Sequence, residues 1–241
     1  MNAIVLAAGK GSRISDEIGP IPKSTLEIDG KPIIRRTVEM LLGHGMNVVI
    51  CTGYRHALIE EALKGLSVKY VNNPFYDVTN NIASLWFAQK YLNDECIIIS
   101  ADVIFNEDLL NKIINKKDDL VMVTDSSRIS DGDYFFHMSD NGTIEKYGPE
   151  IPLDERDYEY VGIDKVSLNV INDFRDKLNE MIDGGEINSY FENVFFTYIN
   201  HSQYRLTVVD VAGCVWREID KINDYQKAKD EFRTEESVRN V

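Results

Sequence analysis

Apolar and polar positions alternate in blocks along the first half of the chain. Short apolar runs predict strands, which cover residues 2–7, 25–28, 47–51, 68–71 and 96–100. Segments between them place apolar side chains at helical spacing, and the helices expected there cover residues 33–43, 55–64 and 81–92. Strands that alternate with helices in this way predict an α/β fold, with a mixed, mainly parallel sheet and helices on both faces. Ligands of such sheets bind beyond the carboxyl ends of the strands.

The second half of the chain has a different pattern. Strands separated by turns are expected at residues 120–125, 134–139, 143–147 and 160–168. Later elements are expected as helices at 170–183 and 188–200, strands at 206–210 and 215–218, and a charged helix from 222. We therefore expect one domain over residues 1–241, in which the region around 126–205 forms a small antiparallel, substrate-binding lid.

The first apolar run leads into a loop of small residues, Ala7-Ala8-Gly9-Lys10-Gly11-Ser12-Arg13. Backbone N–H groups in such a loop can bind phosphate oxygens, and glycines let the ligand approach the main chain closely. Arg13 and Lys23 can neutralise the remaining phosphate charge. The chain has no Walker pattern, and Ile14 stands where a dinucleotide fingerprint needs its third glycine. The alternative is an ordinary strand-to-helix turn.

Composition narrows the ligands that this loop could hold. The formal net charge of −14 argues against a nucleic-acid partner and against an anionic membrane surface, so the functional cations must be local. The three cysteines lack ligand or redox spacing and suit the reducing cytoplasm, where we expect the protein. No apolar run approaches the length of a membrane span, and the N-terminal residues lack a secretion pattern.

The loop, followed by Pro22-Lys23, resembles the nucleotidyltransferase family that makes nucleoside-diphosphate sugars and related activated head groups. The resemblance implies a Rossmann-like, GT-A-like nucleotidyltransferase fold and a catalytic role for Lys23 and Arg13. It also implies that the nucleotide is bound by Leu6, Ala7, Ala8, Gly9, Gly11, Ser12, Arg13 and Lys23. The stretch from residue 14 to 21 lacks the Pro-Leu-Thr often found there in sugar-directed members, which weakens the case for a sugar phosphate.

Two carboxylates are candidate metal ligands. Asp102 directly follows the apolar run at 96–100, and the matching residue of the family binds Mg²⁺; a helix cap is the alternative. Asp220 ends the run Trp216-Arg217-Glu218-Ile219-Asp220, which resembles the C-terminal metal motif of the same family. An acidic helix start is the alternative for Asp220. Mg²⁺ prefers a few carboxylates together with substrate phosphates and water, so this pair would suffice.

An amide-rich segment precedes the helix expected at 81–92. Asn80, Asn81 and Ser84 can read a nucleobase edge, since amides present a donor and an acceptor in one plane; helix capping is the alternative. The Asn-Pro-Phe-Tyr and Thr-Asn-Asn runs of this segment, with the Trp-x-Glu-Ile-Asp ending, resemble the phosphocholine cytidylyltransferase branch, which implies CTP. An aromatic cage for a cationic acceptor could include Tyr160 and Tyr190, with Glu192 as its anionic partner; core packing is the alternative.

These features lead to the hypothesis of a Mg²⁺-dependent cytidylyltransferase, acting as a monomer or homodimer. It would transfer CMP from CTP to phosphocholine, phosphoethanolamine, an aminoalkyl phosphonate or a phosphorylated amino acid amide. A sugar-1-phosphate nucleotidyltransferase is the alternative enzyme. A nucleotide-binding module without turnover is the alternative from a different class.

Overall fold

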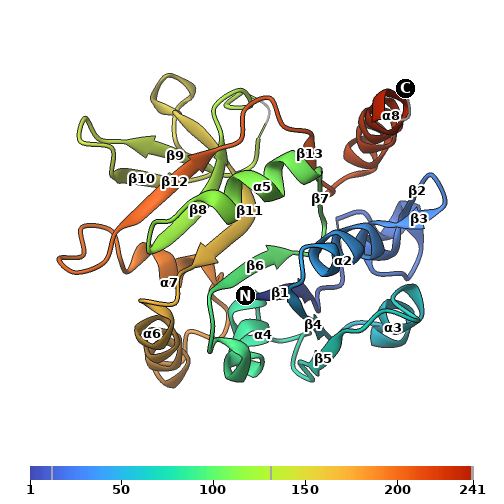
Figure 1. Ribbon diagram of the computed structural model, residues 1–241, viewed down its shortest axis with the longest axis horizontal. Coiled ribbons are helices and arrows are strands. Elements are labelled where there is room, and N and C mark those ends of the chain that lie inside the picture. Colours follow the sequence, from blue (N-terminus) through green and yellow to red (C-terminus); the bar gives the residue numbers. More distant parts are fainter. Residues whose placement is uncertain (12, 131, 240–241) are drawn as a thin grey trace.

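One nine-stranded mixed sheet forms the centre of the protein, described by a computed structural model over residues 1–11, 13–130 and 132–239 (Figure 1). The strands of this sheet and of two small two-stranded sheets are β1 (Asn2–Ala7), β2 (Glu27–Ile28), β3 (Lys31–Pro32), β4 (Asn47–Thr52), β5 (Lys69–Asn72), β6 (Cys96–Ser100), β7 (Val103–Phe105), β8 (Leu120–Asp125), β9 (Phe135–Met138), β10 (Ile144–Gly148), β11 (Tyr158–Val166), β12 (Leu206–Asp210) and β13 (Trp216–Glu218). The helices are α1 (Ser15–Ile18), α2 (Ile33–Gly43), α3 (His56–Ala62), α4 (Asn81–Phe87), α5 (Glu107–Asn115), α6 (Ile171–Asp183), α7 (Glu192–Phe196) and α8 (Ile222–Arg239), with short 3₁₀ turns η1 (Lys23–Thr25), η2 (Gln89–Tyr91) and η3 (Leu153–Glu155).

The strand order of the main sheet is β10-β9-β11-β6-β1-β4-β5, and β8 pairs with both β11 and β12. Figure 1 shows this sheet running from β9 and β10 at one end to β5 at the other. β1 is parallel to β4 and β6, whereas β11 is antiparallel to β6. The expected mixed sheet with a parallel centre is therefore confirmed. Because chain order reverses on either side of β1, a ligand crevice is expected at its carboxyl end.

The two faces of β1 pack against different helices. Ile4 and Leu6 lie in a buried cluster with side chains of α4, α6 and α7. Val5 points to the opposite face, where its buried cluster includes residues of α2, α3 and α5. Alternate residues of one strand thus face opposite helical layers, which explains why β1 is a continuous apolar run.

Helix α8 packs outside the main sheet, against the β2–β3 hairpin (Figure 1). Its Ala228 and Phe232 join a third buried cluster that contains Ile14 and Ile28. Within the described residues, no helix combines the length and apolar character needed to cross a membrane.

Several elements differ from the sequence-based expectations. The antiparallel strands expected in this region form as β9, β10 and β11, and they extend the end of the main sheet. The helix expected at 188–200 is shorter: only α7 is α-helical, since aromatic and β-branched residues follow it and lower helix propensity. Helix α5 was not expected, although Asn106 caps it by accepting a hydrogen bond from Leu109 N at 3.1 Å.

Candidate active site

A cavity of about 300 Å³ opens at the carboxyl ends of β1 and β6. Twelve of the residues selected from the sequence line it: Leu6, Ala7, Ala8, Gly9, Gly11, Arg13, Lys23, Asn80, Asn81, Ser84, Asp102 and Tyr190. Six further lining residues were not selected as site residues, namely Pro22, Ser24, Tyr76, Thr79, Ser100 and Ala101. Ser12 lies outside the described residues.

The loop after β1 is fixed by close backbone contacts. Ala8 O accepts a hydrogen bond from Tyr54 N at 3.0 Å, and a Cβ on Gly53 would approach Ala8 O to 2.8 Å. Gly11 has a φ of +63°, a left-handed conformation that glycine adopts without strain. A Cβ on Gly11 would also lie 2.5 Å from Cγ of Lys23. Glycine at position 11 therefore lets the loop and the Lys23 side chain pack together.

Two strands far apart in sequence bring three carboxylates together. β7 and β13 pair antiparallel, with Glu218 opposite Val103, and Ile219 N donates to Asp102 O at 3.0 Å. As a result, Asp102, Glu218 and Asp220 each offer an oxygen, and these oxygens lie within 4.8 Å of one another. Asp102 and Asp220 were expected from the sequence as the metal ligands, and Glu218 lies beside them in the structure.

Two cations face this carboxylate cluster. Lys23 Nζ lies 2.7 Å from Asp102 Oδ2 and 2.6 Å from Asp220 Oδ1. Arg13 forms an ion pair with Asp220 Oδ2, while its side chain remains 61% exposed. Burial lowers the pKa of Lys23, but the charges of Asp102 and Asp220 outweigh it, so the pKa is raised and the ammonium stays charged.

The donor set of the cluster fits Mg²⁺. Carboxylate oxygens are the protein ligands that this hard cation prefers, and two or three of them leave positions for phosphate and water. Burial, followed by the charges of Asp102 and Asp220, raises the pKa of Glu218 well above its usual range. Such mutual repulsion is relieved when a divalent cation binds among the carboxylates.

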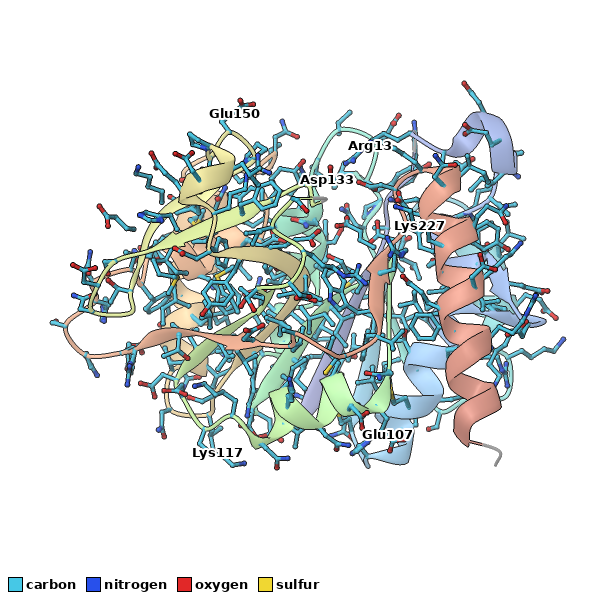
Figure 2. All side chains as sticks on the ribbon, turned by 90° about the horizontal axis from the view of Figure 1, so that it is seen from above. Arg13, Glu107, Lys117, Asp133, Glu150 and Lys227 are labelled. Carbon is cyan, nitrogen blue, oxygen red and sulfur yellow. The ribbon has the colours of Figure 1, made fainter. Side chains whose placement is uncertain are left out.

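Figure 2 labels one residue of this site, Arg13, on the same side of the molecule as Asp133. Arg13 and Asp133 lie along one edge, and Glu107 and Lys117 lie along the opposite edge. Asp133 is near enough to Glu218 for its charge to contribute to the raised pKa of that carboxyl. The end of the segment between β8 and β9 therefore lies close to the carboxylate cluster.

The amide-rich segment both caps α4 and lines the cavity. Asn80 Oδ1 accepts from Asn81 N at 2.8 Å, and Asn81 Oδ1 accepts from Phe191 N at 2.7 Å. Ser84 is buried and its Oγ accepts from Asn73 Nδ2 at 3.0 Å. The side-chain oxygens of Asn80 and Asn81 thus have structural partners, as the capping alternative requires for Asn80. Their positions on the cavity wall keep them candidates for base recognition.

Aromatic and acidic side chains gather near the Tyr190 end of the cavity. Tyr160 and Glu192 do not line the cavity, but Tyr160 Oη lies 3.3 Å from Glu192 Oε1. Tyr160 Oη also lies 2.5 Å from Asp164 Oδ2, and the ring of Tyr134 packs edge-on to Tyr160. Asp164 was not selected from the sequence. An acid with the apolar residues Val161, Ile163 and Val166 around it in one strand is the signal that would have identified it.

The mixed sheet places a glycine-rich loop, two cations and clustered carboxylates at its switch point. This combination defines a nucleotidyltransferase, and comparison with known proteins agrees. The chain belongs to the MobA-like NTP transferase domain family, whose model matches residues 3–154. The expected family and the expected cytidylyltransferase branch are both confirmed.

Two relatives illustrate the branch. The CTP:phosphoglutamine cytidylyltransferase of Campylobacter jejuni is 28% identical, over 94% of this chain and 98% of that protein. The choline-phosphate cytidylyltransferase of Haemophilus influenzae is 41% identical over 110 residues, which are 45% of this chain and 47% of that protein. Among solved structures, the CTP:phosphocholine cytidylyltransferase of Streptococcus pneumoniae superposes with a TM-score of 0.77 at 22% identity, covering 95% of this chain and 97% of the other.

Proposed function

We propose that this protein is a Mg²⁺-dependent cytidylyltransferase for a small phosphorylated or phosphonate acceptor. An acceptor oxygen would attack the α-phosphorus of CTP, forming a new P–O bond while the bond to the β-phosphate oxygen breaks. Pyrophosphate leaves with the bonding electron pair. The acceptor oxygen is already anionic, so no general base is required, and catalysis consists of positioning and charge neutralisation.

The observation that carries this proposal is the contact of two cations with the carboxylate cluster at the cavity. Lys23 bridges Asp102 and Asp220, and Arg13 pairs with Asp220. Incoming phosphates compete with these carboxylates for the same cations. Arg13 is suited to the β- and γ-phosphates, because its exposed guanidinium can bind phosphate in a bidentate manner. Lys23 is suited to the α-phosphate, where its fixed charge would stabilise the transition state.

Asp102, Glu218 and Asp220 would hold Mg²⁺. When bound, Mg²⁺ screens the repulsion between the phosphates and increases the electrophilicity of phosphorus. The chain's own carboxylates supply the negative charge that attracts the cation, while Lys23 and Arg13 balance that charge before the nucleotide arrives.

The nucleotide proposed for this site is CTP. The Campylobacter jejuni relative, which is named for CTP, matches this chain over 98% of its own length. Asn80, Asn81 and Ser84 line the cavity, and their side chains offer polar groups for a base. The region 126–205 is proposed to cover the acceptor end, with Tyr160, Tyr190 and Glu192 as acceptor-binding residues and residues 1–241 acting as one domain.

Pyrophosphate release in a matrix of nucleotides and acceptors tests the proposal. The nucleotides are CTP, UTP, dTTP and ATP. The acceptors are phosphocholine, phosphoethanolamine, 2-aminoethylphosphonate, phosphorylated glutamine and glucose 1-phosphate. Turnover of CTP with an amine-bearing acceptor is expected. Turnover of UTP or dTTP with glucose 1-phosphate would instead establish the alternative enzyme, and CTP binding without turnover of any acceptor would indicate a non-catalytic module.

A further inference from the structure

A buried carboxylate at the end of β8 joins two segments that lie next to the carboxylate cluster. Asp125 Oδ2 accepts a hydrogen bond from Trp216 Nε1 at 2.7 Å. Its Oδ1 accepts from the backbone N–H of Ser127 at 2.8 Å and from the Ser127 hydroxyl at 2.5 Å. Asp125 and Trp216 are both buried, where a hydrogen bond is stronger than in water. One side chain therefore connects β8, β13 and the segment that follows β8.

The indole of Trp216 is held both at its edge and on its face. The edge donates to Asp125, and the guanidinium of Arg128 lies 4.5 Å from the ring centroid. A cation over an indole face is attracted by the electrons of the ring. Arg128 Nε also lies 3.8 Å from Asp125 Oδ2, so the arginine balances part of the carboxylate charge. Two contacts of different kinds thus fix the position and the tilt of the indole.

This indole belongs to the short strand that leads into the carboxylate cluster. β13 pairs with β7 in a two-stranded sheet outside the main sheet. Trp216 and Glu218 are two residues apart in β13, and side chains at that spacing point to the same side of a strand. Asp220 follows two residues later. Movement of the indole would therefore displace Glu218 directly and Asp220 through the backbone.

β8 is a firm support for the contact with Asp125. It pairs antiparallel with β11 and parallel with β12, so both of its edges are hydrogen-bonded within the main sheet. A two-stranded pair such as β7 and β13 has little stability by itself. The hydrogen bond from Trp216 to Asp125 therefore attaches a weakly supported strand to a firmly supported one.

A second cavity, of about 230 Å³, lies beside the same contacts. Arg128, Trp216 and Glu218 are among its lining residues, whereas Asp102 lines the first cavity. The carboxylate cluster therefore borders a hollow on each of two sides. Because a void supplies no packing contacts, the position of Glu218 depends on the strand that carries it.

We propose that Asp125 is a positioning residue of the metal site, which holds Glu218 and Asp220 in place through Trp216. Asp125 itself would touch neither the metal nor the substrate. Residues that orient metal ligands in this way change metal affinity by about 10–100-fold when they are mutated. The alternative is a buried hydrogen bond that contributes to stability alone. The inference rests on the proposed Mg²⁺-dependent activity.

The two tryptophans of the chain provide a matched pair of variants. Trp216→Phe keeps an aromatic ring but removes the N–H that donates to Asp125, while Trp86→Phe removes an N–H that donates to Asn179 Oδ1 at 2.9 Å. Mn²⁺ affinity would be measured by electron paramagnetic resonance with CTP present, and with CTP alone as the blank. We expect Trp216→Phe to weaken Mn²⁺ binding, and to raise the Mg²⁺ concentration for half-maximal turnover, each by about tenfold. Trp86→Phe should change both by less than about twofold, because its partner lies outside the metal site.

The outcomes separate this inference from the proposed function. Unchanged Mn²⁺ affinity in Trp216→Phe, when the wild type binds Mn²⁺, would overturn the positioning role alone. Absence of Mn²⁺ binding by the wild type with CTP would overturn the proposed Mg²⁺-dependent function. The indole N–H gives a further readout, since Trp86→Phe leaves Trp216 as the source of that signal in a proton–nitrogen correlation spectrum. The signal should shift when Mg²⁺ and CTP bind, and a signal that stays in place at saturation would contradict the coupling.

Variants of Asp125 test the acceptor itself. In Asp125→Asn the carboxamide oxygen can still accept from the indole, so Mn²⁺ affinity should stay within about threefold of the wild-type value. Asp125→Leu offers no acceptor and should lose at least about tenfold. Equal losses in the two variants, both folded by circular dichroism, would contradict the role of this hydrogen bond. If Asp125→Leu does not fold, the comparison of Trp216→Phe with Trp86→Phe decides.

Discussion

The backbone of Gly11 packs directly against the side chain of Lys23. A β-carbon at position 11 would lie only 2.5 Å from Lys23 Cγ, and the left-handed φ of +63° would strain any residue other than glycine. The loop that faces the cavity and the lysine that neutralises the carboxylates are thus fitted to each other. A change at either position is expected to disturb both.

Gly11→Ala is therefore expected to lower stability and to impair nucleotide binding. The left-handed backbone alone costs alanine about 1–2 kcal/mol, and the contact with Lys23 adds to this cost. Chemical denaturation would measure the loss of unfolding free energy, and KM for CTP would measure the effect on the site. Gly9→Ala is the matched control for stability, because no atom lies within 4 Å of its β-carbon position. Equal stability of the two variants would contradict the predicted packing.

Lys23→Ala is expected to lower kcat by about 10²–10³-fold while the protein still folds, since a fixed charge near the reacting phosphate is lost. The same variant removes the ammonium group that contacts both Asp102 and Asp220, so the repulsion between the two carboxylates is no longer neutralised. The nucleotide-free protein should therefore bind Mn²⁺ more tightly, as measured by electron paramagnetic resonance. Lys10→Ala removes a lysine of the glycine-rich loop that pairs with exposed Asp77, and its kcat should change only a few-fold. Near-normal kcat in Lys23→Ala would remove Lys23 from the catalytic mechanism.

Asp102→Asn and Asp220→Asn are expected to abolish Mg²⁺-dependent pyrophosphate release. Each substitution removes a charged oxygen ligand, so Mn²⁺ binding in the presence of CTP should weaken by at least about 10–100-fold. Asp154→Asn, a change at an exposed position, serves as control. Full Mg²⁺-dependent activity in either variant would exclude that carboxylate from the metal site.

Glu192→Gln is expected to stabilise the protein at pH 8 but not at pH 5. Burial raises the pKa of Glu192 from 4.5 to about 7, despite lowering contributions from its own backbone amide, Tyr160 and Asn81. A folded-state pKa above the unfolded value means that stability is full below pH 4.5 and decreases as the pH rises to 7. Ionisation then costs up to about 3 kcal/mol, which glutamine avoids. Thermal unfolding of both proteins at the two pH values measures the difference.

Other charged and titratable groups lie around Glu192 and affect its ionisation. Asp102 adds negative charge, the pKa of nearby Asp164 is itself raised, the hydroxyl of Tyr160 contacts Glu192, and Tyr134 lies near it. A gain in melting temperature that is equal at pH 5 and pH 8 would show that ionisation of Glu192 is not its cause. Stabilisation at pH 8 would mean that the wild-type residue is retained at a cost in stability, as expected for a ligand-binding carboxylate.

The sequence predicts the strands correctly where a continuous apolar run marks them. β1 and β6 are continuous apolar runs, and their burial on both faces explains why the pattern identifies them. β7 has only three residues, and it is defined by pairing with β13 instead of by its own sequence. The proximity of Glu218 to Asp102 depends on that pairing, so the sequence could suggest each carboxylate but not their joint geometry.

The acceptor end was less predictable for a similar reason. Tyr160 and Glu192 were selected by residue type, but Tyr160 also contacts Asp164, whose burial follows from the packing of β11 between β6 and β8. Whether a strand acid is solvated or buried depends on which neighbours flank the strand, and these come from distant parts of the chain.

The hydrogen bond from Ile219 to Asp102 joins segments that are more than a hundred residues apart, so the site can form only after the later segment has been synthesised. Two of its three carboxylates arrive on β13 and the residues after it, well beyond the matched family region of residues 3–154. A chain interrupted before β13 would retain the loop and much of the cavity wall but would lack Glu218 and Asp220. On the proposed mechanism, a partly synthesised or clipped chain that lacks these residues could hold a nucleotide without consuming it, so turnover requires the chain to extend at least through Asp220.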